Sequence, residues 1–202
     1  MDLRQTGISA VGDVPWGTHF CIFYASPADL LDVLVPYFRI GLENNEYCLC
    51  ALSRRTLENI SRALRESLPD FDRYAAAGAI EIVAAEDWYG SGGDFDPTVA
   101  MRYLREKLAS ALTAGFTGVR ANGDEAWLQH DQLADFREYE EGLGSALEGS
   151  RMIVGCSYRL DASPAAQVLD VAQTHEFVLA KRESRWERLE LAALKQTKEE
   201  LT

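Results

Sequence analysis

Basic residues are scarce in this chain. Lysine and arginine together number 20 against 32 acidic residues among 202, so the formal net charge is −12 at neutral pH. No stretch gathers lysine and arginine without interleaved acids. Because contacts to phosphates supply most of the affinity for DNA and RNA, this balance argues against a nucleic-acid-binding protein.

Long apolar runs and cysteine pairs of the metal-binding type are also missing. Charges interrupt the longest apolar stretches well before the ~18 residues of a membrane span, so we expect no membrane partner. The four cysteines, Cys21, Cys48, Cys50 and Cys156, lie inside apolar runs and form no C-x-x-C motif. Such cysteines are typical of a reducing compartment, so a cytoplasmic location is expected.

Short apolar runs of the β type alternate with helical patterns along most of the chain. The runs cover residues 19–24, 46–53, 79–89, 116–128, 151–160 and 175–180. This alternation predicts a three-layer α/β fold, in which a mainly parallel, six-stranded sheet is covered by helices on both faces. The 47% of hydrophobic residues suit one domain, placed at residues 1–180. Residues 181–202 are charged and are expected to form a C-terminal helix.

Ligands of such sheets collect beyond the C-terminal ends of the strands. Those ends carry aromatic and acidic side chains and one clear cation, which suits a small organic ligand. Of the histidines, His130 is expected nearest to this pocket. The alternative, which periodicity does not exclude, is that the aromatic side chains seal helices against the sheet. The candidate ligand-binding residues are Tyr24, Asp87, Trp88, Asp124, Glu125, Trp127, Tyr158 and Arg159.

Three enzyme signatures are absent or incomplete. The adjacent acids of "NGDEAWL" (122–128) stand where nucleotide hydrolases hold magnesium, but "YASPADLLD" (24–32) has neither the glycines nor the lysine of a phosphate-binding loop. The stretch "GSGGDFDP" (90–97) has one acid before Phe95, where the cyclic-dinucleotide synthase signature has GG followed by two acids and an aromatic residue, and it is typical of a flexible loop. No G-x-S-x-G nucleophile elbow occurs. We therefore expect no catalytic activity and no cofactor.

Four stretches resemble, in their order and spacing, the MEDS sensory domain of prokaryotic signalling proteins. They are "HFCIFY", "LLDVLVPYFRIGLENNEYCLCAL", "RANGDEAWL" and "CSYRLDASPAAQVLDVAQTHEFVL", which together span residues 19–180. The resemblance implies a RecA/KaiC-like fold that lacks its phosphate loop, with the strand order 6-1-5-4-2-3 when the six runs are numbered along the chain. It also implies a sensor of a small, hydrocarbon-derived molecule that acts on a histidine kinase or a related output domain, as in two-component systems.

Two histidines and a cysteine form a separate candidate. His19 and Cys21, two positions apart on one strand, point to the same side. A four-ligand site with Cys48 and Cys50 is excluded by the implied strand order, which puts the two strands ~14 Å apart, whereas zinc holds its ligands within ~2.3 Å. The same order puts His175 beside His19, so His19, Cys21 and His175 are a candidate metal site. The alternative is a hydrogen-bonded histidine beside a buried thiol.

The tail offers a route for the signal. Trp186, Leu189 and Ala193 recur at three- and four-residue steps, which is typical of a short coiled coil that pairs two protomers. The alternative is a helix packed on its own domain. For the whole chain, the alternatives to a sensor are a RecA-like scaffold that docks a partner protein and has no ligand, and a metal-dependent enzyme.

Overall fold

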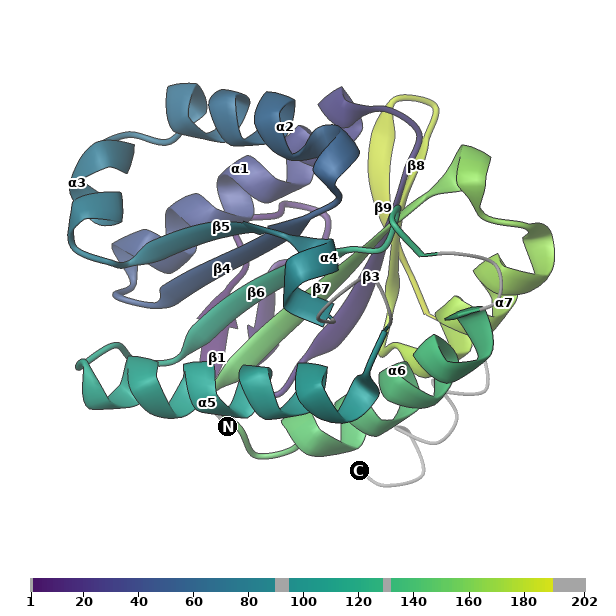
Figure 1. Cartoon of the computed structure of the whole chain (residues 1–202). Helices are drawn as coiled ribbons and strands as arrows, with labels where there is room; N and C mark the ends of the chain where they lie inside the picture. Colours follow the sequence, from purple (N-terminus) through teal and green to yellow (C-terminus); the bar gives the residue numbers. More distant parts are fainter. Residues whose placement is uncertain (1, 90–94, 129–131, 191–202) are drawn as a thin grey trace.

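The computed structural model describes residues 2–89, 95–128 and 132–190 (Figure 1). None of the helices in these segments combines the length and the apolar character that a membrane crossing requires. The strands of these segments are β1 (Leu3–Gln5), β2 (Asp13–Pro15), β3 (His19–Tyr24), β4 (Tyr47–Leu52), β5 (Ile80–Ala84), β6 (Val119–Asp124), β7 (Met152–Arg159), β8 (Val178–Arg182) and β9 (Arg185–Leu189). The α-helices are α1 (Pro27–Glu43), α2 (Arg54–Ser67), α3 (Phe71–Ala76), α4 (Ala85–Tyr89), α5 (Pro97–Thr113), α6 (Leu133–Leu147) and α7 (Ala165–Thr174).

The main sheet has the order β5-β4-β6-β7-β3-β8-β9. Its first six strands are parallel and follow the order that the family resemblance implies, and β9 pairs antiparallel with β8. The sheet therefore has seven strands among the described residues, not the six expected. A separate ribbon of β1 and β2 occupies the start of the chain.

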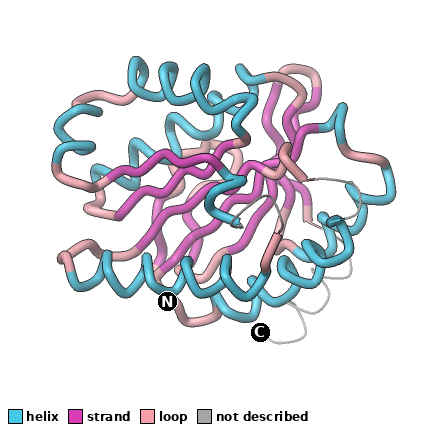
Figure 2. The backbone as a smooth tube through the Cα atoms, viewed as in Figure 1, coloured by secondary structure: helices cyan, strands magenta, loops and turns pink. Residues whose placement is uncertain are grey.

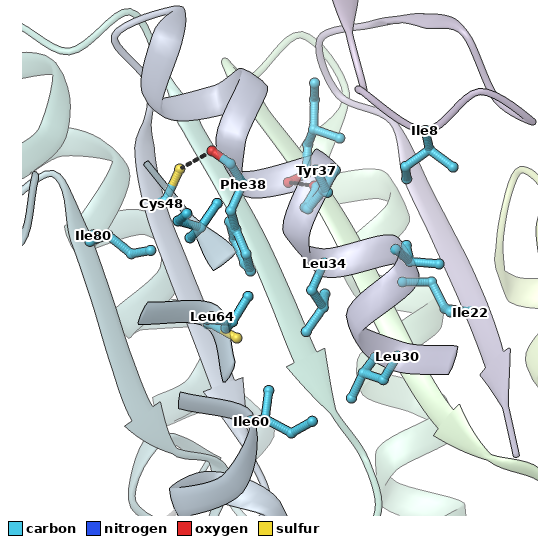
Figure 3. Packing of buried hydrophobic residues seen from close by; sticks show 14 of the residues in the cluster. Ile8, Ile22, Leu30, Leu34, Tyr37, Phe38, Cys48, Ile60, Leu64 and Ile80 are labelled. Atoms are coloured by element: carbon cyan, nitrogen blue, oxygen red, sulfur yellow. Dashed lines mark hydrogen bonds between the residues drawn. The ribbon is translucent and has the colours of Figure 1, made fainter. Parts of the chain in front are cut away.

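Helices cover both faces of this sheet (Figure 2). On β3, whose six residues are all buried, Phe20 and Ile22 face the cluster beneath α1 and α2. Figure 3 shows this cluster, in which Leu34 and Phe38 of α1 pack over the strands. Cys21 of β3 faces the opposite cluster, beneath α5 and α6. A parallel sheet buried on both faces needs apolar side chains on both sides of each strand, which explains the near-continuous apolar runs.

The C-terminal helix expected from residue 181 is wrong for the described part of the tail. β8 continues to Arg182, a turn follows at Glu183 and Ser184, both with positive φ, and the chain returns as β9. Trp186 lies on β9 and packs at the margin of the α1 cluster. Pairing with β9 satisfies the backbone groups that β8 would otherwise expose at the sheet edge. Residues 191–202, which carry the rest of the expected coiled coil, lie outside the described residues.

Arg120 of β6 is the largest fully buried side chain of the described residues. Its Nε donates to Glu46 Oε2 at 2.6 Å, and its terminal nitrogens donate to the carbonyls of Gln5 at 2.8 Å and Tyr37 at 3.2 Å. Arg4 donates to the other oxygen of Glu46 at 2.9 Å. These contacts join the β1–β2 ribbon, α1, β4 and β6, so the buried charge is neutralised only when all four elements are in place.

Removing the charge of Glu46 should therefore destabilise the fold. We expect Glu46→Gln to lower the free energy of unfolding by about 3 kcal/mol, because a buried guanidinium would lose its counter-charge. The matched control is Glu106→Gln, which breaks the exposed Arg102–Glu106 pair of α5 and should cost less than about 0.5 kcal/mol. Urea denaturation measures both values, and equal losses would contradict the role given to Arg120.

Candidate functional site

Tyr24 and Asp124 meet at the C-terminal ends of β3 and β6, as the sequence predicts. Their polar atoms bond to each other and to neighbouring residues, so they are not free to bind a ligand. The Tyr24 hydroxyl donates to Asp124 Oδ1 at 2.8 Å. Oδ2 accepts from the backbone N–H of Ser53 and from the Thr56 hydroxyl, both at 3.1 Å. All four residues are buried. Burial, followed by the charge of Asp124, raises the pKa of Tyr24 well above its ordinary value. This arrangement ties β3, β6 and α2 together.

Asp87 and Trp88 lie apart from that contact, on α4. Asp87 is exposed and pairs with Arg54 at the start of α2. Trp88 is buried against Tyr103 of α5, with ring centroids 6.0 Å apart. Both residues line a cavity of about 500 Å³ beside α5. The structure therefore places these two candidates in a different cavity from Glu125, Tyr158 and Arg159.

Glu125 and Trp127 follow β6 and are both in contact with Tyr89. The Tyr89 hydroxyl donates to Glu125 Oε1 at 3.1 Å, and the Trp127 ring stacks on the Tyr89 ring at 5.4 Å. Gly123 permits this approach, since a Cβ there would lie 2.2 Å from the Tyr89 oxygen. Burial first, and then the negative charge of Glu140, raise the pKa of Glu125 well above its ordinary value. The protonated form of Glu125 is consequently favoured in the folded protein relative to the unfolded chain.

A cavity of about 350 Å³ lies between α6 and α7. Phe136 of α6 and Val171 of α7 line it, and Glu140 and Tyr158 lie at its inner side. The Tyr158 hydroxyl is buried and has no hydrogen-bond partner among the described residues. Across the two helices, Arg137 pairs with Asp170 at 3.2 Å.

A second cavity, of about 220 Å³, adjoins the first. It shares Tyr158, Pro164 and Gln167 with the larger cavity and is also lined by Glu125 and Arg159. The Arg159 guanidinium pairs with Asp161 at 2.6 Å. Three of the residues predicted from the strand ends, Glu125, Tyr158 and Arg159, thus border one continuous region.

A buried cluster of His19, Glu140, Cys156 and His175 lies behind the larger cavity. The Nε2 atoms of both histidines are 3.1 Å from Glu140 Oε2, and His19 Nε2 is 3.3 Å from Cys156 Sγ. The two imidazole centroids are 4.0 Å apart. Burial and the neighbouring His175 lower the pKa of His19 to about 4, against the opposing effect of Glu140. Although burial alone would raise it, the pKa of Glu140 is lowered by the two facing histidines.

The buried cluster differs in its residues from the metal site predicted from the sequence. The structure brings His19 and His175 together, as expected, but the nearest partner of Cys21 Sγ is the Phe177 carbonyl, at 3.9 Å. Cys156, directly opposite Cys21 in the β3–β7 register, takes its place. Cys48 and Cys50 belong to the cluster beneath α1, on the opposite face of the sheet, so they lie outside this group.

Sequence reasoning missed Glu140 and Cys156. Glu140 stands at helical spacing between Phe136, Leu143 and Leu147, all of which are buried. A carboxylate within the apolar stripe of a helix was the available signal. The signal for Cys156 was its position in the apolar run 151–160, because the implied strand order puts that run beside the run 19–24, which contains His19. His130 and residues 90–94, which carry most of the glycine-rich loop, lie outside the described residues.

Comparison with known proteins gives the family. The family model of the MEDS domain, described as the methanogen/methylotroph, DcmR sensory domain, matches residues 18–176. The transcriptional repressor DcmR of Methylorubrum extorquens is 24% identical over 167 residues. That alignment covers 81% of this chain and 60% of the repressor, so the chain spans less than two thirds of that relative. Since the family model covers most of the chain, including the cavities and the buried cluster, this protein belongs to the MEDS family of sensory domains.

Proposed function

We propose that this chain is a non-catalytic sensory domain of a prokaryotic signal-transduction protein, which binds a small organic molecule between α6 and α7. The observation that carries the proposal is the cavity of about 350 Å³ at that place. Its volume lies within the range of small-molecule sites. The family description and the repressor name of the relative support a regulatory role.

The side chains around the cavity favour a mostly apolar ligand that carries one hydrogen-bonding group. Phe136 and Val171 offer apolar contact. The Tyr158 hydroxyl can donate to an oxygen or a halogen of the ligand, since it has no other partner among the described residues. Glu125, whose pKa is raised by burial, lines the adjoining cavity as a second polar group. A small hydrocarbon derivative meets these requirements.

The turn between β3 and α1 supports a role without nucleotide hydrolysis. In phosphate-binding loops, free backbone N–H groups at the start of a helix hold the phosphates. Here the Asp29 carboxylate accepts from the backbone N–H groups of Ala25, at 3.3 Å, and Ser26, at 3.0 Å. Lys181 pairs with the same carboxylate at 2.8 Å. We regard the domain as a RecA/KaiC-like fold whose phosphate site is replaced by a helix cap, and the strand order is consistent with this.

We infer that the signal leaves through the C-terminal end of the domain. α7, which forms one side of the cavity, leads directly through His175 into β8 and then β9. A ligand that favours one position of α7 would shift the population of β8 positions and of whatever follows residue 190. A histidine kinase or related output domain, and a second protomer, are the partners that we propose. A scaffold without a ligand is the competing role.

A bulky residue at the cavity should abolish ligand binding. We expect Gln167→Trp to weaken binding at least tenfold, which corresponds to about 1.4 kcal/mol, because the indole would occupy the space shared by both cavities. The measurement is ligand-observed NMR with short-chain alcohols, ketones and halogenated alkanes. The control Ser110→Trp fills the cavity beside α5 and should leave binding unchanged. If no probe binds the wild-type chain, the scaffold role is favoured.

Glu125 should make stability depend on pH in a defined direction. Its pKa in the folded protein lies above the unfolded value, so its stabilising contribution is complete below pH ~4.5 and is lost as the pH rises towards the folded pKa. The Glu125→Gln variant has no carboxyl group at this position, so its stability does not show this decrease with rising pH. The free energy of unfolding of the variant minus that of the wild type should therefore grow as the pH rises above ~4.5, at most by about 1.4 kcal/mol per pH unit.

Denaturant unfolding at several pH values measures that difference. Exposed Glu148→Gln serves as the control, and its difference from the wild type should stay flat over the same range. Parallel curves for Glu125→Gln and the wild type would show that Glu125 is ionised in the folded protein.

A further inference from the structure

We propose that His19, Glu140, Cys156 and His175 bind one divalent transition-metal ion, with Zn²⁺ as the best match. The four side chains come from β3, α6, β7 and the residue after α7, so only the folded chain brings them together. One ligand atom from each lies within 4.8 Å of all the others. This inference concerns an ion and is independent of the organic ligand proposed above.

The distances fit a tetrahedral ion. Zn–N and Zn–O bonds of ~2.0–2.1 Å and a Zn–S bond of ~2.3 Å place the ligand atoms ~3.3–3.6 Å from one another. Three of the separations here are 3.1, 3.1 and 3.3 Å, between His19 Nε2, His175 Nε2, Glu140 Oε2 and Cys156 Sγ. The other three separations are at most 4.8 Å, so side-chain movements of about an ångström would place all four atoms around one centre.

The hydrogen bonds of His175 fix which of its nitrogens faces the cluster as a lone pair. Its Nδ1 lies 2.7 Å from the Val171 carbonyl, which only accepts, so Nδ1 carries the proton. A neutral ring then points a bare Nε2 at Glu140 Oε2, 3.1 Å away, where two acceptors face each other. A metal cation between them, or a proton on either atom, relieves this repulsion. A histidine that donates its second N–H to a backbone carbonyl is also the usual arrangement behind a metal.

The oxygens of Glu140 give independent support. Both are buried, and neither they nor His175 Nε2 make a hydrogen bond with acceptable geometry among the described residues. Both histidine Nε2 atoms lie 3.1 Å from the same oxygen, Glu140 Oε2. A buried carboxylate in an apolar cluster requires such compensation.

The composition of the cluster selects the class of ion. Imidazole and thiolate favour Zn²⁺ and its neighbours in the first transition row, whereas Mg²⁺ and Ca²⁺ prefer oxygen ligands. Binding would release the Cys156 proton, since the thiolate is the ligand. A divalent ion, one thiolate, one carboxylate and two neutral imidazoles then sum to zero charge, which suits a buried site.

The ion would lie at the inner side of the cavity between α6 and α7. Glu140 lines that cavity, and so does Thr174, the residue before His175. Bonds to Glu140 and His175 would hold α6 and the end of α7 against β3 and β7. The spacing of the two helices, and with it the shape of the cavity, would depend on the ion.

Metal content and a cobalt spectrum test this assignment. The full chain is produced in medium supplemented with Zn²⁺ and examined by native mass spectrometry, where one ion per chain is expected. Chain loaded with Co²⁺ instead should show a thiolate-to-metal charge-transfer band and the intense absorption of tetrahedral Co²⁺. Circular dichroism verifies that each variant below is folded.

The adjacent cysteines provide a matched pair of variants. Cys156→Ser should remove the charge-transfer band and weaken Zn²⁺ binding by at least about 100-fold, since loss of a direct ligand exceeds the effect of losing a supporting group. Cys21→Ser, at the facing position of the next strand, should retain both the band and the affinity. Glu140→Gln should weaken Zn²⁺ binding while keeping the thiolate band at saturating Co²⁺.

Three results would overturn the assignment. They are a metal-free wild-type chain after growth and reconstitution with Zn²⁺, a Co²⁺ spectrum without a thiolate band, and equal binding by Cys156→Ser and the wild type. The first would identify the cluster as a buried proton network in which His175 is an imidazolium. None of these results depends on whether an organic molecule binds between α6 and α7.

Discussion

The constraint that governs this molecule is a parallel sheet covered on both faces, which leaves no water for a polar group on its central strands. Each such group has to find its partners inside the protein. Arg120 does so completely, through Glu46 and backbone carbonyls, on the α1 face of the sheet. On the other face, Glu140 contributes a charge whose oxygens lack hydrogen bonds of good geometry among the described residues. Glu46 and Glu140 thus differ in that only Glu46 has its charge paired through well-formed hydrogen bonds among the described residues.

Much of the sheet could be predicted from the sequence because burial on both faces makes each parallel strand a continuous apolar run, such as residues 19–24. The tail could not. In "RWERL" (185–189), charged and aromatic residues alternate over too few positions to distinguish a strand from a helix. The segment becomes a strand because β8 would otherwise leave its backbone hydrogen-bonding groups unpaired at the edge of the sheet, and β9 pairs with them. That open edge exists only once the sheet has assembled, so the sequence pattern does not show it.

The candidate site was predictable in part, for a related reason. Parallel strands bring their ends together, so the contact of Tyr24 with Asp124 follows from their positions in the sequence. Whether that contact is open to a ligand depends on Ser53 and Thr56, which close it and which no strand-end rule includes. Glu140 reaches the strands from a helix far along the chain. Its depth depends on how α6 packs, which a residue pattern alone does not determine.

The cavity and the buried cluster share Glu140, and α7 connects both to the end of the domain. This arrangement sets how the two proposals would act on each other. An ion bound to Glu140 and His175 opposes any separation of α6 from α7, so a ligand that needs such separation must do work against metal–ligand bonds. Thermodynamic linkage makes the effect mutual: occupancy of the cavity changes the affinity for the ion by the same factor. A domain built in this way would respond to an organic molecule and to metal supply through one helix.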